Sequence, residues 1–509
     1  MQAVEQPAHL QGCLAVQVAG GLVGQHHERV VGQRARARDP LALAAGQRAA
    51  VAPRGGLLQD DLLCGRDSSG KNSPAAGAGA GTAGSRGLLA DRRVRYVLVA
   101  LVASGTANGI LPVTESFAVL QVTGSAGKLG IVLACQGAVA LLLSLAGGLA
   151  GDRFPRGRIL IVSSVARLAA AVTLSVTLLT HTASFGVLLA GAAGYGAASG
   201  FFGPVSAAVL PDIAAPGQLA AANALIGGVS SSAAIIAPAI AGVIVAALGA
   251  GSGFACEAAV LAVMAGFLAA ARVPARRAGR PGDGHVLGQL RAGWKEFARL
   301  RWLWLLTLQW TLFSLLILAP VAVLGPAIAE RFLGGAAAWG IISSCLALGA
   351  VGGQLAAGRL RPGRPAMVAA CLVPVMIAEA LALGLGAPTG VVAAAATVTG
   401  LALGIYAVIF QTMMQTAVPA AVLARVSAFD LLGSELAQPA GYALAGPAGT
   451  AVGLHTFLAA GSAVVFLGAA AMTLPRSLRD RALAYGSRSR MAEPAGISHD
   501  REPDGGGLA

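Results

Sequence analysis

Residues 147–158 read Gly-Gly-Leu-Ala-Gly-Asp-Arg-Phe-Pro-Arg-Gly-Arg, and this short charged stretch separates two long apolar runs, 127–150 and 159–180. Apolar runs of about 20 residues cross a bilayer as helices, so the stretch is predicted to form the tight turn between two membrane spans. Its arginines mark that side of the membrane as the cytoplasmic side.

Asp152 is the informative residue of this turn. It lies where the preceding helix ends and the helix dipole is already negative, so its carboxylate needs a positive partner. Arg153, Arg156 and Arg158 are near in sequence, and Gly148 with its neighbouring glycines would let another helix pack closely. We interpret the cluster as a conformational latch that clamps two helix ends. The alternative is an ordinary turn that carries only the positive-inside signal.

The composition is that of a polytopic membrane protein. The 509 residues are 56% hydrophobic and 11% charged, with a mean hydropathy of +0.73. A soluble chain carries about 25% charged residues. The net charge of +14 does not indicate a nucleic-acid partner, because the basic residues beyond the amino-terminal stretch gather in alternate loops. The six cysteines have no paired spacing, so we expect neither disulfides nor a metal site, and no motif predicts a cofactor.

Apolar runs and their breakers predict twelve spans. They cover 94–120, 127–150, 159–180, 184–210, 217–249, 252–272, 302–328, 336–357, 366–387, 389–418, 423–447 and 451–474. Arginines fall in every second loop, which predicts that both termini are cytoplasmic. Residues 353–364, Gly-Gln-Leu-Ala-Ala-Gly-Arg-Leu-Arg-Pro-Gly-Arg, repeat the opening stretch, although Gly358 stands where the first copy has Asp152.

The opening stretch resembles the signature loop between spans two and three of the major facilitator superfamily, Gly-x-x-x-Asp-Arg-x-x-Arg-x-Arg. Residues 94–474 look most like its drug and siderophore exporter branch, which includes the enterobactin exporter. The pieces that carry this likeness are 120–125, 201–204, 210–212 and 222–225. The resemblance implies an all-α membrane protein with twelve transmembrane helices in two six-helix pseudo-repeats. Asp212 resembles the family's partner for the loop arginines.

The expected organisation follows from these spans. Residues 94–272 and 302–474 form the two six-helix halves, and 273–301 join them as an amphipathic helix on the inner surface or as a solvated linker. Residues 1–93 are a disordered cytoplasmic tail or upstream sequence that the mature protein lacks. Residues 475–509 are expected to be a disordered cytoplasmic tail.

Ionisable residues inside spans are functional candidates. Glu435 lies near mid-membrane in the eleventh span, and Glu115 lies toward the outer end of the first span. Either could carry a coupling proton. The alternatives are a hydrogen-bonded neutral carboxyl for Glu435 and a headgroup-level carboxylate for Glu115. Glu379 is a weaker candidate, while Glu257 and Asp430 are expected at the membrane interface. Arg167, midway along the third span, has no explanation from the sequence.

The resemblance places spans one, four, seven and ten around a central cavity. The candidate cavity residues are Asn108, Phe201, Phe202, Gln309, Trp310, Phe313, Tyr406, Phe410, Gln411 and Gln415. Aromatic rings with a few amides suit an apolar or cationic organic ligand, although residues of these types more often serve helix packing. The fifth span looks like the family's antiporter signature, with a helix bend at Pro238 and Gly242, except that Ala237 replaces the glycine before the proline.

We therefore expect a monomeric exporter in the bacterial inner membrane that expels a small organic molecule by proton antiport. An importer or uniporter of the same fold is the alternative. A polytopic membrane enzyme is disfavoured because no HExxH motif and no paired intramembrane aspartates are present.

Overall fold

The computed structural model describes residues 91–213, 219–273, 297–418 and 435–472, together with a few residues between them: Trp294, Leu423, Val426, Ser427, Asp430 and Gly433. Regular structure within these residues is helical. The amino-terminal stretch up to residue 90, most of the linker 273–301 and the tail after 472 lie outside them, so the expectations for those segments stay predictions.

Six helices form the first half, and their bounds agree with the predicted spans to within a few residues. They are α3 (Arg92–Thr123), α4 (Ala126–Arg153), α5 (Arg156–Leu179), α6 (Phe185–Ile213), α7 (Leu219–Leu248) and α8 (Ala250–Ala271). The turn between α4 and α5 holds only Phe154 and Pro155, as the opening stretch predicted. Serine and aspartate cap the first helices: Asp91 accepts from the Arg93 amide and Ser125 from the Lys128 amide.

The second half has the same span order with more interruptions. It contains α10 (Arg301–Phe313), η2 (Ser314–Leu318), α11 (Ala319–Ile328), η3 (Ala329–Leu333), α12 (Gly335–Ala357), α13 (Pro365–Met376), α14 (Ala378–Gly384), α15 (Thr389–Ala417), α17 (Ala437–Val452) and α18 (Leu454–Met472). The eleventh span ends at Val452, five residues later than predicted, because the turn to the twelfth is at Gly453.

Two spans of this half deviate from regular α-helix. Span seven contains the π segments η2 and η3, which widen the helix locally. Span nine is broken at Ile377, three residues after Pro374, whose ring cannot continue a regular helix. The Thr399 hydroxyl of α15 satisfies two backbone groups at the break. It accepts a hydrogen bond from the Glu379 amide (3.1 Å) and donates one to the Met376 carbonyl (3.2 Å).

The described helices fit a membrane. Eleven spans are long and apolar enough to cross a bilayer, and α17, with 16 described residues, occupies the place of the twelfth. Large apolar side chains such as Leu142, Val162 and Leu467 are more than 60% exposed, as expected for helices that face lipid rather than water. The fold class predicted from the sequence is confirmed.

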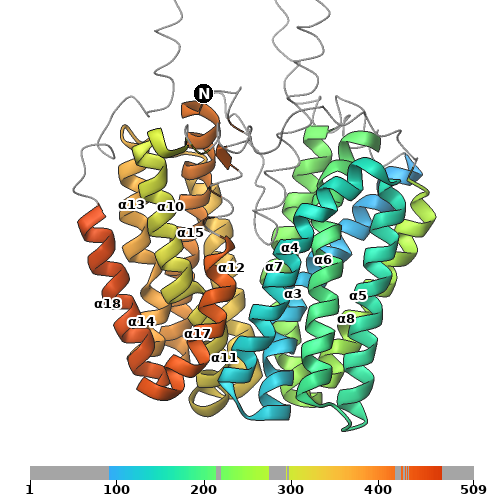
Figure 1. The fold of residues 1–509 in the computed structure, drawn as a ribbon, viewed down its shortest axis with the longest axis horizontal. Helices are drawn as coiled ribbons and strands as arrows, with labels where there is room; N and C mark the ends of the chain where they lie inside the picture. Colours follow the sequence, from blue (N-terminus) through green and yellow to red (C-terminus); the bar gives the residue numbers. More distant parts are fainter. Residues whose placement is uncertain are drawn as a thin grey trace, which may run out of the picture.

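The two halves converge at one end of the bundle (Figure 1). We call the end with the α4–α5 turn and Arg359, Arg361 and Arg364 the arginine-rich end. The opposite end carries the turns at Gly124, Gly249, Gly334 and Gly453. In Figure 1 the halves approach each other at the opposite end, where α4 and α7 meet α17 and α12.

Glycines make these contacts between the halves. A Cβ on Gly242 of α7 would lie 2.5 Å from the Ala336 carbonyl oxygen, and one on Gly340 of α12 would lie 2.5 Å from the Pro238 carbonyl oxygen. On the other pair, Gly446 of α17 lies directly against Gly127 of α4. Only residues without a side chain let these backbones come so close.

Candidate functional site

Arg167 of α5 is the largest fully buried side chain of the described protein, with 1% of its surface exposed. Its guanidinium donates to Asn108 Oδ1 of α3 (2.7 Å), to the Tyr195 hydroxyl of α6 (2.5 Å) and to Ser104 Oγ of α3 (3.4 Å). It also lies over the Tyr195 ring (4.7 Å) and the Phe202 ring (5.5 Å). Since all three acceptors are neutral, these bonds leave the positive charge uncompensated.

Glu257 of α8 is the acid of this network. Its side chain has no exposed surface, and it interacts electrostatically with Arg167 and Tyr195. Neither carboxyl oxygen accepts a geometrically complete hydrogen bond from the described residues. Glu257 lies about two turns from Ala250, the first residue of α8, and its side chain points into the helix bundle. The expectation that it lies at the depth of the membrane interface stays a prediction.

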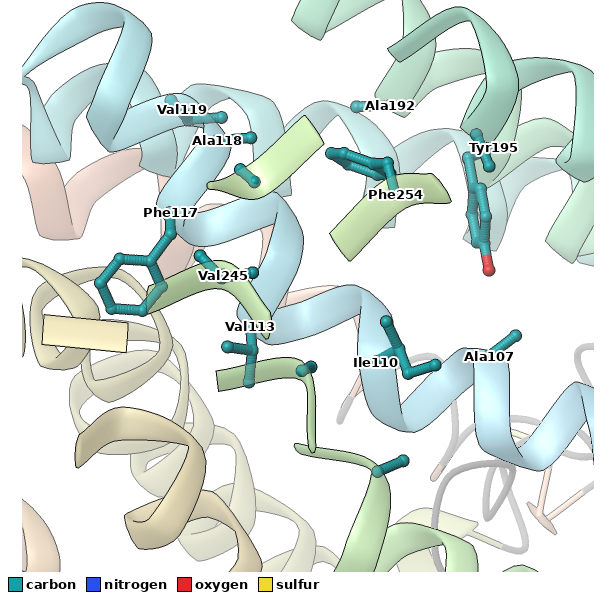
Figure 2. Packing of buried hydrophobic residues seen from close by; sticks show 14 of the residues in the cluster. Ala107, Ile110, Val113, Phe117, Ala118, Val119, Ala192, Tyr195, Val245 and Phe254 are labelled. Atoms are coloured by element: carbon teal, nitrogen blue, oxygen red, sulfur yellow. The ribbon is translucent and has the colours of Figure 1, made fainter. Parts of the chain in front are cut away.

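Glu115 of α3 is also buried, with 5% of its surface exposed, so the neighbouring helices cover its carboxyl. It interacts with the Gln136 amide of α4 and electrostatically with Glu257. Packing brings the two acids close: Gly253, one turn before Glu257, lies against Thr114, the residue before Glu115. Figure 2 shows part of the apolar core of the first half, where the Tyr195 hydroxyl is the one polar atom on the labelled side chains.

The signature loop lies at the arginine-rich end. Arg156 donates to the Ala208 carbonyl oxygen of α6 at 3.0 Å, and Arg153 and Arg158 are exposed. Gly147 lies against Gly200 of α6, whereas a Cβ on Gly148 would meet nothing within 4 Å. The side chains of Asp152 and Asp212 lie outside the described part of the structure, so their pairing with the arginines stays a prediction.

Three aromatic rings stack in the second half. Tyr406 of α15 lies between Trp310 of α10, at a centroid distance of 5.1 Å, and Phe410, at 5.7 Å. The ring planes are within 13° and 7° of parallel, and Phe313 packs against Trp310 at 5.5 Å. Four of the predicted cavity residues are thus brought together.

Two carboxylates lie near this stack. Asp430 accepts a hydrogen bond from the Thr307 hydroxyl of α10 at 2.5 Å and interacts electrostatically with Tyr406. The helices around it cover most of its side chain, and the expectation that Asp430 lies at the depth of the membrane interface stays a prediction. Glu435, two residues before α17, is half-buried and interacts electrostatically with Asp430.

The other predicted cavity residues are dispersed. Gln309 is buried and donates to the Ala370 carbonyl oxygen of α13 at 3.0 Å, so it ties two helices together. Gln411 is half-buried and Gln415 is exposed. Asn108, Phe202 and the partly buried Phe201 lie in the first half, where the first two surround Arg167.

Tyr195 and Ser104 were missed by sequence reasoning. An intramembrane arginine signals that polar partners must exist, but the partners come from three other helices and no spacing rule connects them. Glu379, the acid of span nine, is 95% buried in α14. Among the described residues, no group of three or more His, Cys, Asp or Glu side chains is placed to hold a metal ion.

Comparisons with known proteins agree with this geometry. Residues 96–325 match the family model of the Major Facilitator Superfamily. A search among curated proteins found no significant match. Similar solved structures include a bacterial homologue of the human lysosomal transporter Spinster in an inward-facing, unoccupied conformation, with TM-score 0.54 and 15% identity over 79% of this chain and 98% of that one.

Two further similar structures are transporters. A peptide transporter, POT, in complex with sulfate has TM-score 0.62 and 12% identity, covering 79% of this chain and 99% of its own. The nucleoside transporter NupG has TM-score 0.59 and 12% identity, covering 75% of this chain and all of its own. At 12–15% identity, these likenesses show the fold. The described chain thus has the major facilitator fold of a multi-pass membrane protein, and in sequence it is similar to that superfamily over residues 96–325.

Proposed function

We propose that this protein is a secondary active transporter that exports a small organic molecule in exchange for protons. The observation that carries the proposal is that two six-helix halves are joined through glycine contacts at one end, while buried charged and aromatic groups occupy their interiors. Halves joined in this way can rock about a midplane site and expose it to one side at a time.

The proposed orientation follows from charge. The arginine-rich end is cytoplasmic by the positive-inside rule, in a bacterial inner membrane with both termini inside. The contacts between the halves then lie at the outer side, so the described state is closed to the outside. The loop residues Asp152, Arg153, Arg156 and Arg158, with Asp212, would close the inner side in the other state. Arg156 already bonds the end of α6 that carries Asp212.

The proposed substrate region combines the stack of Trp310, Tyr406 and Phe410 with Asn108 and Phe202. Parallel aromatic faces suit a flat apolar or cationic organic molecule. Glu115 and Glu435 are the proposed proton carriers, and the chain is expected to work as a monomer. Import or facilitated diffusion by the same fold is the second candidate, since the peptide and nucleoside transporters named above share the fold.

Accumulation assays test the function. A panel of dyes, antibiotics and siderophores is measured in exporter-deficient bacteria that express the intact chain, Asp152→Asn or Glu435→Gln. We expect the intact chain to lower accumulation of at least one compound, and both variants to lose this. Export that persists after a protonophore collapses the proton gradient would refute antiport. Uptake of labelled nutrients, with no compound exported, would instead favour the importer.

A further inference from the structure

The first half contains one permanently charged base and two acids in one buried network. Arg167 and Glu257 are both at least 99% buried, and Glu115 is 95% buried. Arginine stays protonated at every pH a protein experiences. A buried charge without compensation is costly in the interior of a membrane protein, so the network favours a total charge of zero.

Charge counting then gives the number of protons. With both acids ionised, the network carries one negative charge too many for Arg167 alone. With both protonated, the arginine charge is uncompensated. One proton on the two carboxyls makes the network neutral. We take Glu257 to be the acid that stays ionised, because Arg167 acts electrostatically on Glu257 and not on Glu115.

The surroundings of the pair contain few other titratable groups. On the elements packed against them they are Arg167 on α5, Tyr195 on α6, Cys256 beside Glu257 on α8, and Tyr442 on α17, with Glu435 beyond it. Residues 219–248 of α7 and 319–328 of α11 contain no ionisable residue. From α4, the contribution is the Gln136 amide, whose Nε2 is buried and donates no geometrically complete hydrogen bond in this arrangement.

We propose that Glu115 and Glu257 share one exchangeable proton, with Arg167 as the fixed counter-charge, and that this pair is the proton-coupling site of the first half. The proposal rests on the proposed proton-coupled transport and names the site that performs it. Tyr195 is a positioning residue, because it lies between Arg167 and Glu257 and reacts with neither.

The contact between the halves connects this site with alternating access. Tyr442 of α17 interacts with Glu115, and its backbone lies against Gly130 of α4. When the opposite end opens, α17 must leave α4, and Tyr442 then leaves Glu115. The shared proton exchanges with the outside in that state, while Glu257 and Arg167 stay together inside one half.

Infrared spectroscopy of the full chain reconstituted in liposomes tests the proposal without a substrate. The carbonyl-stretching band of protonated carboxyl groups is compared at pH 7 between the intact chain and single variants. Glu115→Gln removes the residue that holds the proton, so the band should lose one carboxyl. Glu257→Gln should lose the same one carboxyl, because Glu115 then ionises to compensate Arg167.

Variants of Arg167 test the counter-charge, and loss of its charge should increase the band of protonated carboxyl groups. Arg167→Gln should gain one protonated carboxyl, since no counter-charge holds Glu257 ionised, and Arg167→Lys should leave the band unchanged. If Arg167→Gln does not fold, the lysine variant and the two glutamine variants still decide. The matched control is Glu379→Gln, which removes a buried acid of the other half. The span of Glu379 contains no arginine, so this variant should leave the part of the infrared band that comes from Glu115 unchanged.

Two results would overturn the proposal. One is a Glu115 band that persists in Glu257→Gln, and the other is an Arg167→Lys variant that gains a carboxyl. The proposed function is tested separately, by the accumulation panel. The infrared result does not depend on export, so it supports or refutes the shared proton even if the chain exports none of the compounds.

Discussion

The two halves share a span order but use their interiors differently. The third span of the first half carries the buried Arg167, which bonds Asn108 and Tyr195. The third span of the second half, α13 with α14, contains no basic residue, is broken at Ile377 and carries the acid Glu379. The second half instead stacks Trp310, Tyr406 and Phe410. The pseudo-repeat therefore preserves the order of the spans, while the buried polar network lies in the first half and the aromatic stack in the second.

Removing the charge of the first half should have the largest effect. Arg167→Met leaves Glu257 buried without its counter-charge and Asn108, Tyr195 and Ser104 without a donor. We expect the free energy of unfolding to fall by about 3–5 kcal/mol. Denaturant titration in mixed micelles measures this. Arg158→Met, at an exposed position, is the control and should change stability by less than about 0.5 kcal/mol. Equal losses for both variants would show that the buried network contributes nothing of its own.

Disrupting the stack of the second half should have a smaller effect. Tyr406→Leu removes two parallel ring contacts, each of which contributes about 0.5–1.5 kcal/mol beyond area burial. We expect a loss of about 1–3 kcal/mol in the free energy of unfolding and a weaker near-ultraviolet circular dichroism signal from the ring contacts. Tyr406→Phe keeps the stack and should retain most of both. If Tyr406→Phe loses as much as Tyr406→Leu, the hydroxyl near Asp430 matters more than the stack.

The contact between the halves can be weakened without touching either interior. Gly242→Leu places a side chain where the Ala336 carbonyl lies 2.5 Å from the Cβ position. Overpacking costs about 1–3 kcal/mol, and about 1.4 kcal/mol shifts a two-state population tenfold. We expect roughly that increase in the open state of the opposite end.

A cysteine at Ala126 can report this opening. Ala126 lines a pocket of about 400 Å³ between the turns at the opposite end, with Ser125, Phe332 and His455, and only 6% of its surface is exposed while the end is closed. In a background without the six native cysteines, labelling by a membrane-impermeant maleimide should rise about tenfold, in line with the population shift. Gly266→Leu on α8, where a Cβ meets nothing within 4 Å, is the matched control. Unchanged labelling in Gly242→Leu would mean that this contact does not hold the end closed.

The smallest effect is expected at the signature loop. Gly148→Ala adds a Cβ in open space, so we expect a change below about 0.5 kcal/mol in the free energy of unfolding. Gly147→Ala places a Cβ 2.8 Å from the Gly200 carbonyl oxygen and should cost more, about 1–3 kcal/mol. Comparing the two variants separates the packing role of these glycines from any other role of the loop. If Gly148→Ala is stable but transports much less, Gly148 makes a close contact in the other conformation of the transporter.

The fold was largely predictable, because hydropathy and breakers determine where a chain crosses a membrane. The interruptions of the helices in the second half were harder to predict. Pro374 signals the interruption of span nine, but the predicted span ran through it, and nothing in 314–318 announces a π segment.

The site was harder to predict because depth along a helix says nothing about which way a residue faces. Glu257 and Asp430 were expected at the membrane interface from their distance to a span end, and that distance does not reveal that the surrounding helices cover their side chains. Arg167 stood out in the sequence, yet its meaning depends on Tyr195 and Asn108, which reach it from two other helices. The pairing of Asp152 with the arginines concerns a side chain outside the described residues and stays a prediction.

The glycine contacts between the halves have an energetic consequence. Gly242 contacts Gly340, and Gly127 contacts Gly446, through backbone atoms. Because no side chains interlock at these points, the helices can part there without any side chain changing its rotamer. At these contacts the helices part as two smooth surfaces do, while side chains such as Val323, which lies against Gly130, form the rest of the joint. A charge that crosses the membrane yields about 2.3 kcal/mol per 100 mV. The glycine contacts therefore reduce the work that a single ion has to supply when the joint opens.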